Sequence, residues 1–189
     1  MMKTAPRAFA LAAACGLALS ACSYDPVEDT ETQVAVNDGD TLASALSGNE
    51  DLSTLADALS EADLNSLFDG PGSYTVLAPT DSAFEALGER GGALLSEEQR
   101  PLLVGLLRDH IVVGHITPDA IRSAIESGGG SARMATMGDG DVTFGMNGDV
   151  LTVTAPNGQT ARIAAQVVEA GNGVALPIDS VLLPEGADQ

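Results

Sequence analysis

Residues 74–84 read Tyr74-Thr-Val-Leu-Ala-Pro-Thr-Asp-Ser-Ala-Phe84, and this stretch decides the fold. Its first four residues favour a β-strand, which Pro79 then ends. Thr80 or Asp81 can accept hydrogen bonds from the first N–H groups of a following helix, and Phe84 is placed to anchor that helix in a core. The stretch therefore predicts a short strand that turns directly into a helix.

Upstream of this stretch, leucines recur at the three- and four-residue spacing of one helix face. The apolar positions are Leu42, Leu46, Leu52, Leu55, Leu59, Leu64, Leu67 and Phe68. Gly70-Pro71-Gly72 interrupts this spacing just before the strand. We expect two or three short helices between residue 40 and this break.

Two further helix starts follow downstream. Ser96-x-x-Gln99 has the form of a capping box, in which each side chain satisfies a backbone N–H at the other residue, and an apolar stripe runs over residues 102–107. Pro101 is awkward inside that helix, so an alternative start places proline in the first turn. Thr117-Pro118-Asp119 combines a capping hydroxyl, a preset φ and a negative charge, which is typical of a helix start.

The last third of the chain changes to strand-like sequence after a run of three glycines at residues 128–130. The β-branched or alternating runs cover residues 133–137, 141–146, 150–154, 161–168 and 174–183. Asn-Gly turns lie among them, and we expect Asn172-Gly173 to supply a left-handed turn before a largely buried closing strand. Pro177 in that strand predicts an edge or a bulge. Helices first and strands later predict an α+β fold rather than repeated βαβ units.

The N-terminus carries the signature of an exported, acylated protein. Lys3 and Arg7 precede a short apolar run, which predicts a secretory signal peptide over residues 1–21. Leu19-Ser20-Ala21-Cys22 resembles the lipobox of bacterial lipoproteins, which implies cleavage before Cys22 and acylation of that cysteine, with palmitate among the acyl chains. By the resemblance to lipoproteins of the Gram-negative kind, Ser23 beside Cys22, rather than aspartate, implies an outer-membrane location, with the domain on the periplasmic or the surface face. An ordinary signal peptide that ends near Cys22 is the alternative.

Charge and cysteine content narrow the function classes. Residues 22–189 contain 27 acidic residues, six arginines and no lysine, so the mature chain would carry a formal charge of −21. Such a surface repels phosphates and argues against nucleic-acid binding. Residues 22–39 are acidic and poor in large apolar groups, which predicts a flexible tether. With Cys15 removed and Cys22 acylated, no thiol is left for a disulfide or a thiolate metal site.

Three stretches together resemble a fasciclin (FAS1) domain: residues 74–84, the central Leu106-Leu-Arg-Asp-His-Ile-Val-Val-Gly114, and residues 170–184. The resemblance spans residues 40–184 and leaves 185–189 as a tail. It implies a FAS1 (β-grasp-like) α+β fold, with helices from the N-terminal half packed on a strand-rich C-terminal half. This chain departs from the usual family pattern at Asp109, where many members carry tyrosine, and at Ala175-Leu176-Pro177, where many carry histidine.

His110 is the strongest candidate for a catalytic residue in this sequence, but the sequence offers no second residue placed to assist its imidazole in catalysis. The chain has only one other histidine, His115, and Asp109 lies about 100° away from His110 around a helix, where it cannot orient the imidazole. We therefore interpret the family-motif residues as mainly structural, without a catalytic role or metal. They are Thr80, Asp81, Phe84, His110, Asn172, Gly173 and Asp179.

A calcium site is the alternative for the acidic turns of the last third. Its oxygen ligands would come from Asp139, Asp141, Asn147 and Asp149. Their spacing does not match an EF-hand loop, and such residues are common in turns, so the turn interpretation is favoured. We expect no cofactor.

The family resemblance implies a non-enzymatic module for cell adhesion, or for interaction with extracellular protein or carbohydrate, held at the bacterial envelope by the lipid on Cys22. The alternative is a protein that binds a small apolar ligand, because some fasciclin-like proteins bind carotenoids. No nucleic acid is expected as a partner. The identity of the protein or carbohydrate partner does not follow from the sequence.

Overall fold

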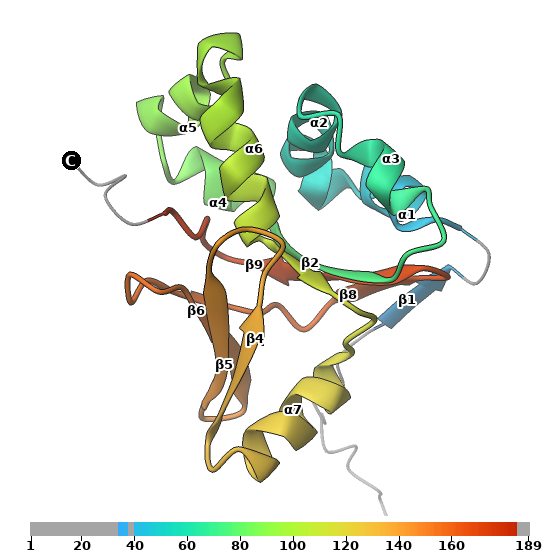
Figure 1. Ribbon diagram of the computed structural model, residues 1–189, viewed down its shortest axis with the longest axis vertical. Helices are drawn as coiled ribbons and strands as arrows, with labels where there is room; N and C mark the ends of the chain where they lie inside the picture. Colours follow the sequence, from blue (N-terminus) through green and yellow to red (C-terminus); the bar gives the residue numbers. More distant parts are fainter. Residues whose placement is uncertain (1–33, 38–39, 185–189) are drawn as a thin grey trace, which may run out of the picture.

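The computed structural model describes residues 34–37 and 40–184. Its strands form two sheets (Figure 1), a five-stranded sheet in the order β1-β8-β9-β2-β3 and a four-stranded antiparallel sheet in the order β4-β5-β6-β7. The first sheet is built from β1 (Val34–Asn37), β8 (Val167–Ala170), β9 (Gly173–Ile178), β2 (Tyr74–Pro79) and β3 (Ile111–Val113). The second contains β4 (Ser131–Ala135), β5 (Asp141–Asn147), β6 (Val150–Thr154) and β7 (Thr160–Arg162).

The described helices all precede the second sheet in the chain, and all but the last of them cover one face of the first sheet (Figure 1). They are α1 (Leu42–Ser47), α2 (Ser53–Glu61), α3 (Asn65–Phe68), α4 (Asp81–Glu85), α5 (Glu89–Leu94) and α6 (Arg100–Asp109), with 3-10 turns at Glu50–Leu52 and Glu97–Gln99. The last helix, α7 (Pro118–Ser127), packs instead against β4 and β5. The α+β fold with N-terminal helices on a strand-rich C-terminal half is therefore confirmed.

The five-stranded sheet separates two apolar cores, because successive side chains of a strand point to opposite faces. In β2, Val76 faces the core beneath the helices, whereas Leu77 faces the core shared with the second sheet. In β9, Ala175 and Leu176 divide in the same way. Burial on both faces explains why these two parallel, neighbouring strands are mostly apolar; the one buried polar side chain of β2, Thr75, is hydrogen-bonded to the backbone of Gly114 and Ile116.

Threonine hydroxyls begin three of the helices. Thr41 accepts a hydrogen bond from the Ser44 N–H at the start of α1, and Thr80 and Thr117 do the same for α4 and α7. The predicted capping box at Ser96 is wrong: its hydroxyl donates back to the Ala93 carbonyl at 2.7 Å instead of capping the next turn. The alternative start is confirmed, with Pro101 in the first turn of α6.

The domain also begins earlier than the sequence predicts. Residues 22–39 were expected to form a tether, but Val34–Asn37 form β1, which pairs in parallel with β8 at the edge of the first sheet. The signal peptide, Cys22 and the tail at 185–189 lie outside the described residues.

Three predictions about the closing region are wrong. The predicted run 161–168 divides between β7 and β8, which belong to different sheets. Residues 181–183 are not a strand, although Val181 and Leu182 are buried. Pro177 lies in a central strand rather than at an edge. The ladder of β8 with β9 ends at Ala175, so Pro177 occupies a position where the neighbouring strand no longer pairs.

Gly173 is required for a different reason than the predicted left-handed turn, because neither Asn172 nor Gly173 has a positive φ among the described residues. A Cβ on Gly173 would instead overlap the Tyr74 carbonyl oxygen and the Leu42 side chain. The glycine therefore permits the close approach of β9 to β2.

Candidate functional site

His110 directly follows α6 and joins that helix to the C-terminal segment. Its side chain is 1% exposed. The Nε2 atom accepts a hydrogen bond from the Leu182 N–H at 3.1 Å, so Nδ1 carries the proton and donates to the Leu106 carbonyl at 2.8 Å. Burial lowers the pKa of His110 to about 4, against an ordinary value of 6.5, although the Leu106 contact acts in the opposite direction. The ring is therefore neutral, and each of its two nitrogens forms a hydrogen bond with a backbone group.

Asp81 caps a helix that lies far from it in sequence. Its Oδ2 accepts from the Ser53 hydroxyl at 2.7 Å and its Oδ1 from the Thr54 N–H at 2.8 Å, at the start of α2. Burial would raise the pKa of Asp81, but these hydrogen bonds outweigh burial and hold the pKa below its ordinary value. Phe84, from the same motif, is buried in the core beneath the helices.

The closing motif also holds backbone. Asn172 Oδ1 accepts from the Leu42 N–H at 2.7 Å, and its Nδ2 donates to the carbonyls of Phe68 and Gly70. Asp179 Oδ1 accepts from the Arg162 N–H at 2.8 Å. The predicted motif residues therefore lie in separate parts of the fold, where they form hydrogen bonds with backbone groups or pack in the core. The structure does not gather them into one site.

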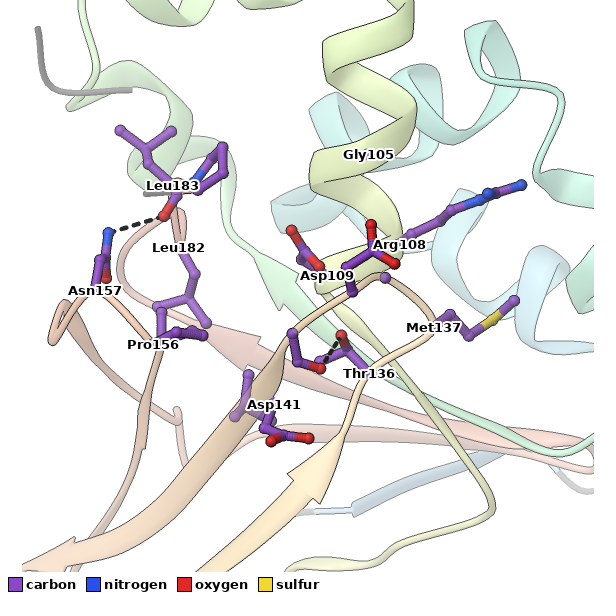
Figure 2. Close-up of a pocket in the computed structure, with 16 residues that line it drawn as sticks. Gly105, Arg108, Asp109, Thr136, Met137, Asp141, Pro156, Asn157, Leu182 and Leu183 are labelled. Atoms are coloured by element: carbon purple, nitrogen blue, oxygen red, sulfur yellow. Dashed lines mark hydrogen bonds between the residues drawn. The ribbon is translucent and has the colours of Figure 1, made fainter. Parts of the chain in front are cut away.

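A cleft of about 450 Å³ opens beside the C-terminal end of α6 (Figure 2). Its walls come from the end of α6, the turn at residues 136–142, the turn at 155–157 and the C-terminal segment at 182–184. Leu182, Leu183 and Pro156 make one wall mainly apolar, while Asp109 lies on the α6 side. Four separate segments thus meet at one depression.

The C-terminal wall of the cleft is held by hydrogen bonds from side chains rather than by pairing with a neighbouring strand. Besides the contact of His110 with Leu182, the Gln159 side chain donates to the Val181 carbonyl at 2.8 Å and accepts from the Leu183 N–H at 3.0 Å. Asn157 Nδ2 donates to the Leu183 carbonyl at 2.9 Å (Figure 2). These contacts explain how a segment without regular structure keeps its buried backbone groups paired.

The opposite wall is equally well held. The Met137 N–H donates to the Ile111 carbonyl at 2.7 Å, and the Gly138 N–H donates to the Arg108 carbonyl at 3.1 Å. Gly138 fits so closely against α6 that a Cβ there would overlap the Asp109 carboxylate. This turn is therefore docked on the end of α6.

Carboxylates dominate the charge around the cleft. Burial, and then the charge of Asp139, raise the pKa of Asp109 above its ordinary value, although the Thr136 side chain opposes this shift. Asp141 Oδ2 forms an ion pair with Arg133 Nε at 3.5 Å. The side chain of Arg108 extends away from Asp109 (Figure 2).

The four oxygen donors considered for calcium do not converge. Asp139 and Asp141 lie at the cleft end of β5, whereas Asn147 is the last residue of that strand and Asp149 follows it, about 20 Å away for a strand of this length. Within residues 34–37 and 40–184, no group of three or more His, Cys, Asp or Glu side chains is arranged to hold a metal ion.

No local pattern indicated this cleft, because its residues come from four distant segments. The departure from the family pattern at Asp109 was the only signal available. The family itself is clear: the fasciclin domain model matches residues 50–184. The chain belongs to the fasciclin domain family.

Among its relatives is Protein sll1483 of Synechocystis, 34% identical over 97% of this chain and 99% of that protein. Cell surface glycolipoprotein MPB83 of Mycobacterium bovis is 30% identical over 77% of this chain and 61% of its own length. The FAS1 domain pair of the insect cell adhesion molecule fasciclin I shares the fold, with a TM-score of 0.50 and 24% identity over 70% of this chain and 41% of that one.

The helices of the described part of this fasciclin chain are all too short or too polar to cross a membrane.

Proposed function

We propose that this chain is a lipid-anchored FAS1 lipoprotein that acts as a non-enzymatic adhesion or interaction module at the bacterial envelope. Family membership supports an extracellular interaction module. The lipobox at Cys22 supports the anchor, as does the likeness to a cell surface glycolipoprotein. Its partner would be a protein or a carbohydrate outside the cell or in the periplasm, and an outer-membrane location is the one that Ser23 favours.

The observation that carries the non-enzymatic role is the state of His110. Both of its ring nitrogens hold backbone groups, and its pKa of about 4 leaves the ring neutral at neutral pH. A general base needs a nitrogen lone pair directed at a substrate, and a general acid needs a proton free to leave. His110 offers neither, which supports binding rather than catalysis as the role of the domain.

The anchor is tested by making the full chain and its Cys22→Ser variant in Gram-negative bacteria grown with labelled palmitate. We expect the label and the membrane location only in the unchanged chain, because the variant lacks the acylated sulfur. Equal distribution of the two chains between membrane and soluble fractions would contradict the anchor.

The module is tested with the same two strains on surfaces coated with matrix proteins or with envelope polysaccharides. Cells carrying the anchored chain should be retained on at least one coating, and cells carrying Cys22→Ser should be washed away. Retention that is the same for both strains, or for neither, would contradict an adhesive role.

A further inference from the structure

We propose that the cleft beside α6 receives a basic side chain, a lysine ammonium or an arginine guanidinium, from a partner protein. This inference rests on the proposed function, because it presumes that the chain is an interaction module. It adds the place of contact and the chemistry of the group bound there.

The shape of the cleft suits a long side chain with a charged tip. Its volume of about 450 Å³ lies within the range of about 300 to 1,000 Å³ that is usual for small-ligand sites. Leu183 and Pro156 line one side and Asp109 the other (Figure 2). Lysine and arginine place an apolar stem against apolar surface while the charged group reaches a polar end. The stem would lie along Leu183 and the charge would meet Asp109.

Most of the surroundings of Asp109 disfavour its negative charge, although the Thr136 side chain favours it, which indicates that the charge has another use. Asp109 is the last residue of α6, where the helix dipole is already negative and favours cations instead. Asp139 adds like-charge repulsion from the facing turn. None of the ion pairs found among the described residues involves either carboxylate. A bound cation would relieve this repulsion.

The net negative charge of the whole chain also favours a basic partner. A formal charge of −19, which becomes −21 once residues 1–21 are removed, draws cationic molecules toward the surface and repels acidic ones. A second copy of this chain is therefore a poor occupant, since it carries the same excess of acid and has no lysine beyond Lys3. Charge complementarity thus points to a basic partner of a different kind.

The cleft is also held ready for binding. Hydrogen bonds from His110, Asn157 and Gln159 fix the C-terminal wall, and the docking of Gly138 on α6 fixes the facing turn. A site with fixed walls loses little conformational freedom when it is filled, which favours binding.

Fluorescent oligoarginine and oligolysine peptides, with the Nε-acetylated oligolysine as a neutral control, provide the test. Their binding to the purified full chain is measured by anisotropy in non-ionic detergent at about 0.15 M salt, where diffuse attraction is screened. The variants are Asp109→Asn and Asp139→Asn. Asp149→Asn is the matched control, because it removes the same charge from an exposed turn at the far end of β5.

We expect the two cleft variants to bind basic peptides about fivefold more weakly, because each loses one partly exposed charge contact. The control variant Asp149→Asn should bind as tightly as the unchanged chain does. The acetylated peptide should not bind. Equal weakening in all three variants, or no binding to the unchanged chain, would overturn the inference. Thermal melting of each variant checks that the fold is kept.

The two proposals can fail separately. Retention of cells on a coated surface without peptide binding in the cleft would remove only the inference. Peptide binding in the cleft without retention would remove only the adhesive role.

Discussion

Replacement of His110 by alanine tests the account of the closing region most directly. The change leaves a cavity at a fully buried position and removes the acceptor of the Leu182 N–H. It also removes the donor to the Leu106 carbonyl, which is one of the last four carbonyls of α6 and has no regular helical partner. An orphaned buried N–H costs about 1 to 3 kcal/mol, and a cavity of this kind costs a further ~2 kcal/mol. The expected loss is therefore about 4 kcal/mol at neutral pH.

The same variant should have a shallower dependence of stability on pH. The folded-state pKa of about 4 lies below the ordinary value of 6.5, so the unfolded chain binds the proton more readily between these values. The contribution of His110 is therefore complete above pH 6.5 and declines by about 3 kcal/mol as the pH falls to about 4. His110→Ala lacks this contribution, so its deficit should narrow to about 1 kcal/mol in acid.

The assay is urea denaturation of the full chain, followed by circular dichroism, at about pH 8 and about pH 4. His115→Ala is the control, because His115 is exposed in the loop before α7, and its change should alter stability by less than about 0.5 kcal/mol. The reasoning is refuted by a loss below about 1 kcal/mol at the higher pH, or by a deficit that stays constant between the two.

Three further changes test other contacts. Gly173→Ala should destabilise the fold by about 2 kcal/mol in urea denaturation, because its Cβ would push β9 away from the Tyr74 carbonyl; unchanged stability would contradict the close approach. Asp81→Ala should cost about 1 kcal/mol by uncapping α2, and its lowered pKa means that the deficit disappears as the pH falls below the ordinary 3.8; a deficit that persists in strong acid would argue against the cap. Asp109→Asn should raise the free energy of unfolding by roughly a few tenths of a kcal/mol after allowance for its partial exposure, because burial and the charge of Asp139 disfavour the ionised carboxylate; a lower free energy of unfolding in urea denaturation would contradict this.

The sequence predicted the elements that local chemistry specifies. The leucine spacing before residue 70, the threonine caps and the turn at Pro79 each act within a few residues, so α1 to α4 and β2 appear where expected. Predictions failed where distant groups decide the outcome. Pro177 fits a central strand only because β8 has ceased to pair there, and residues 181–183 are held by side chains rather than by a neighbouring strand.

The cleft could not be predicted from the sequence for the same reason, because distant groups form it. Its residues belong to four segments whose spacing carries no periodic signal, and the sequence around Asp139 indicates only an ordinary turn. From the sequence, the motif residues are interpreted as mainly structural. In the structure, Asp81, His110 and Asn172 form hydrogen bonds with backbone groups, whereas Phe84 is buried in the core. Asp109 differs from the residue that many related sequences carry, and together with Asp139 and Asp141 it gives the cleft its negative charge.

Stability and binding therefore make opposite demands on two neighbouring residues, the last residue of α6 and the residue that follows it. His110 is neutral, buried and fully hydrogen-bonded, so its replacement should weaken the fold. Asp109 is half-buried and charged beside a second carboxylate, so its replacement by asparagine should strengthen the fold and weaken binding of a basic peptide. A residue that opposes stability and supports binding is expected at functional sites. If Asp109→Asn instead weakened both, the carboxylate would be part of the scaffold, and the cleft would lose its strongest claim to a function.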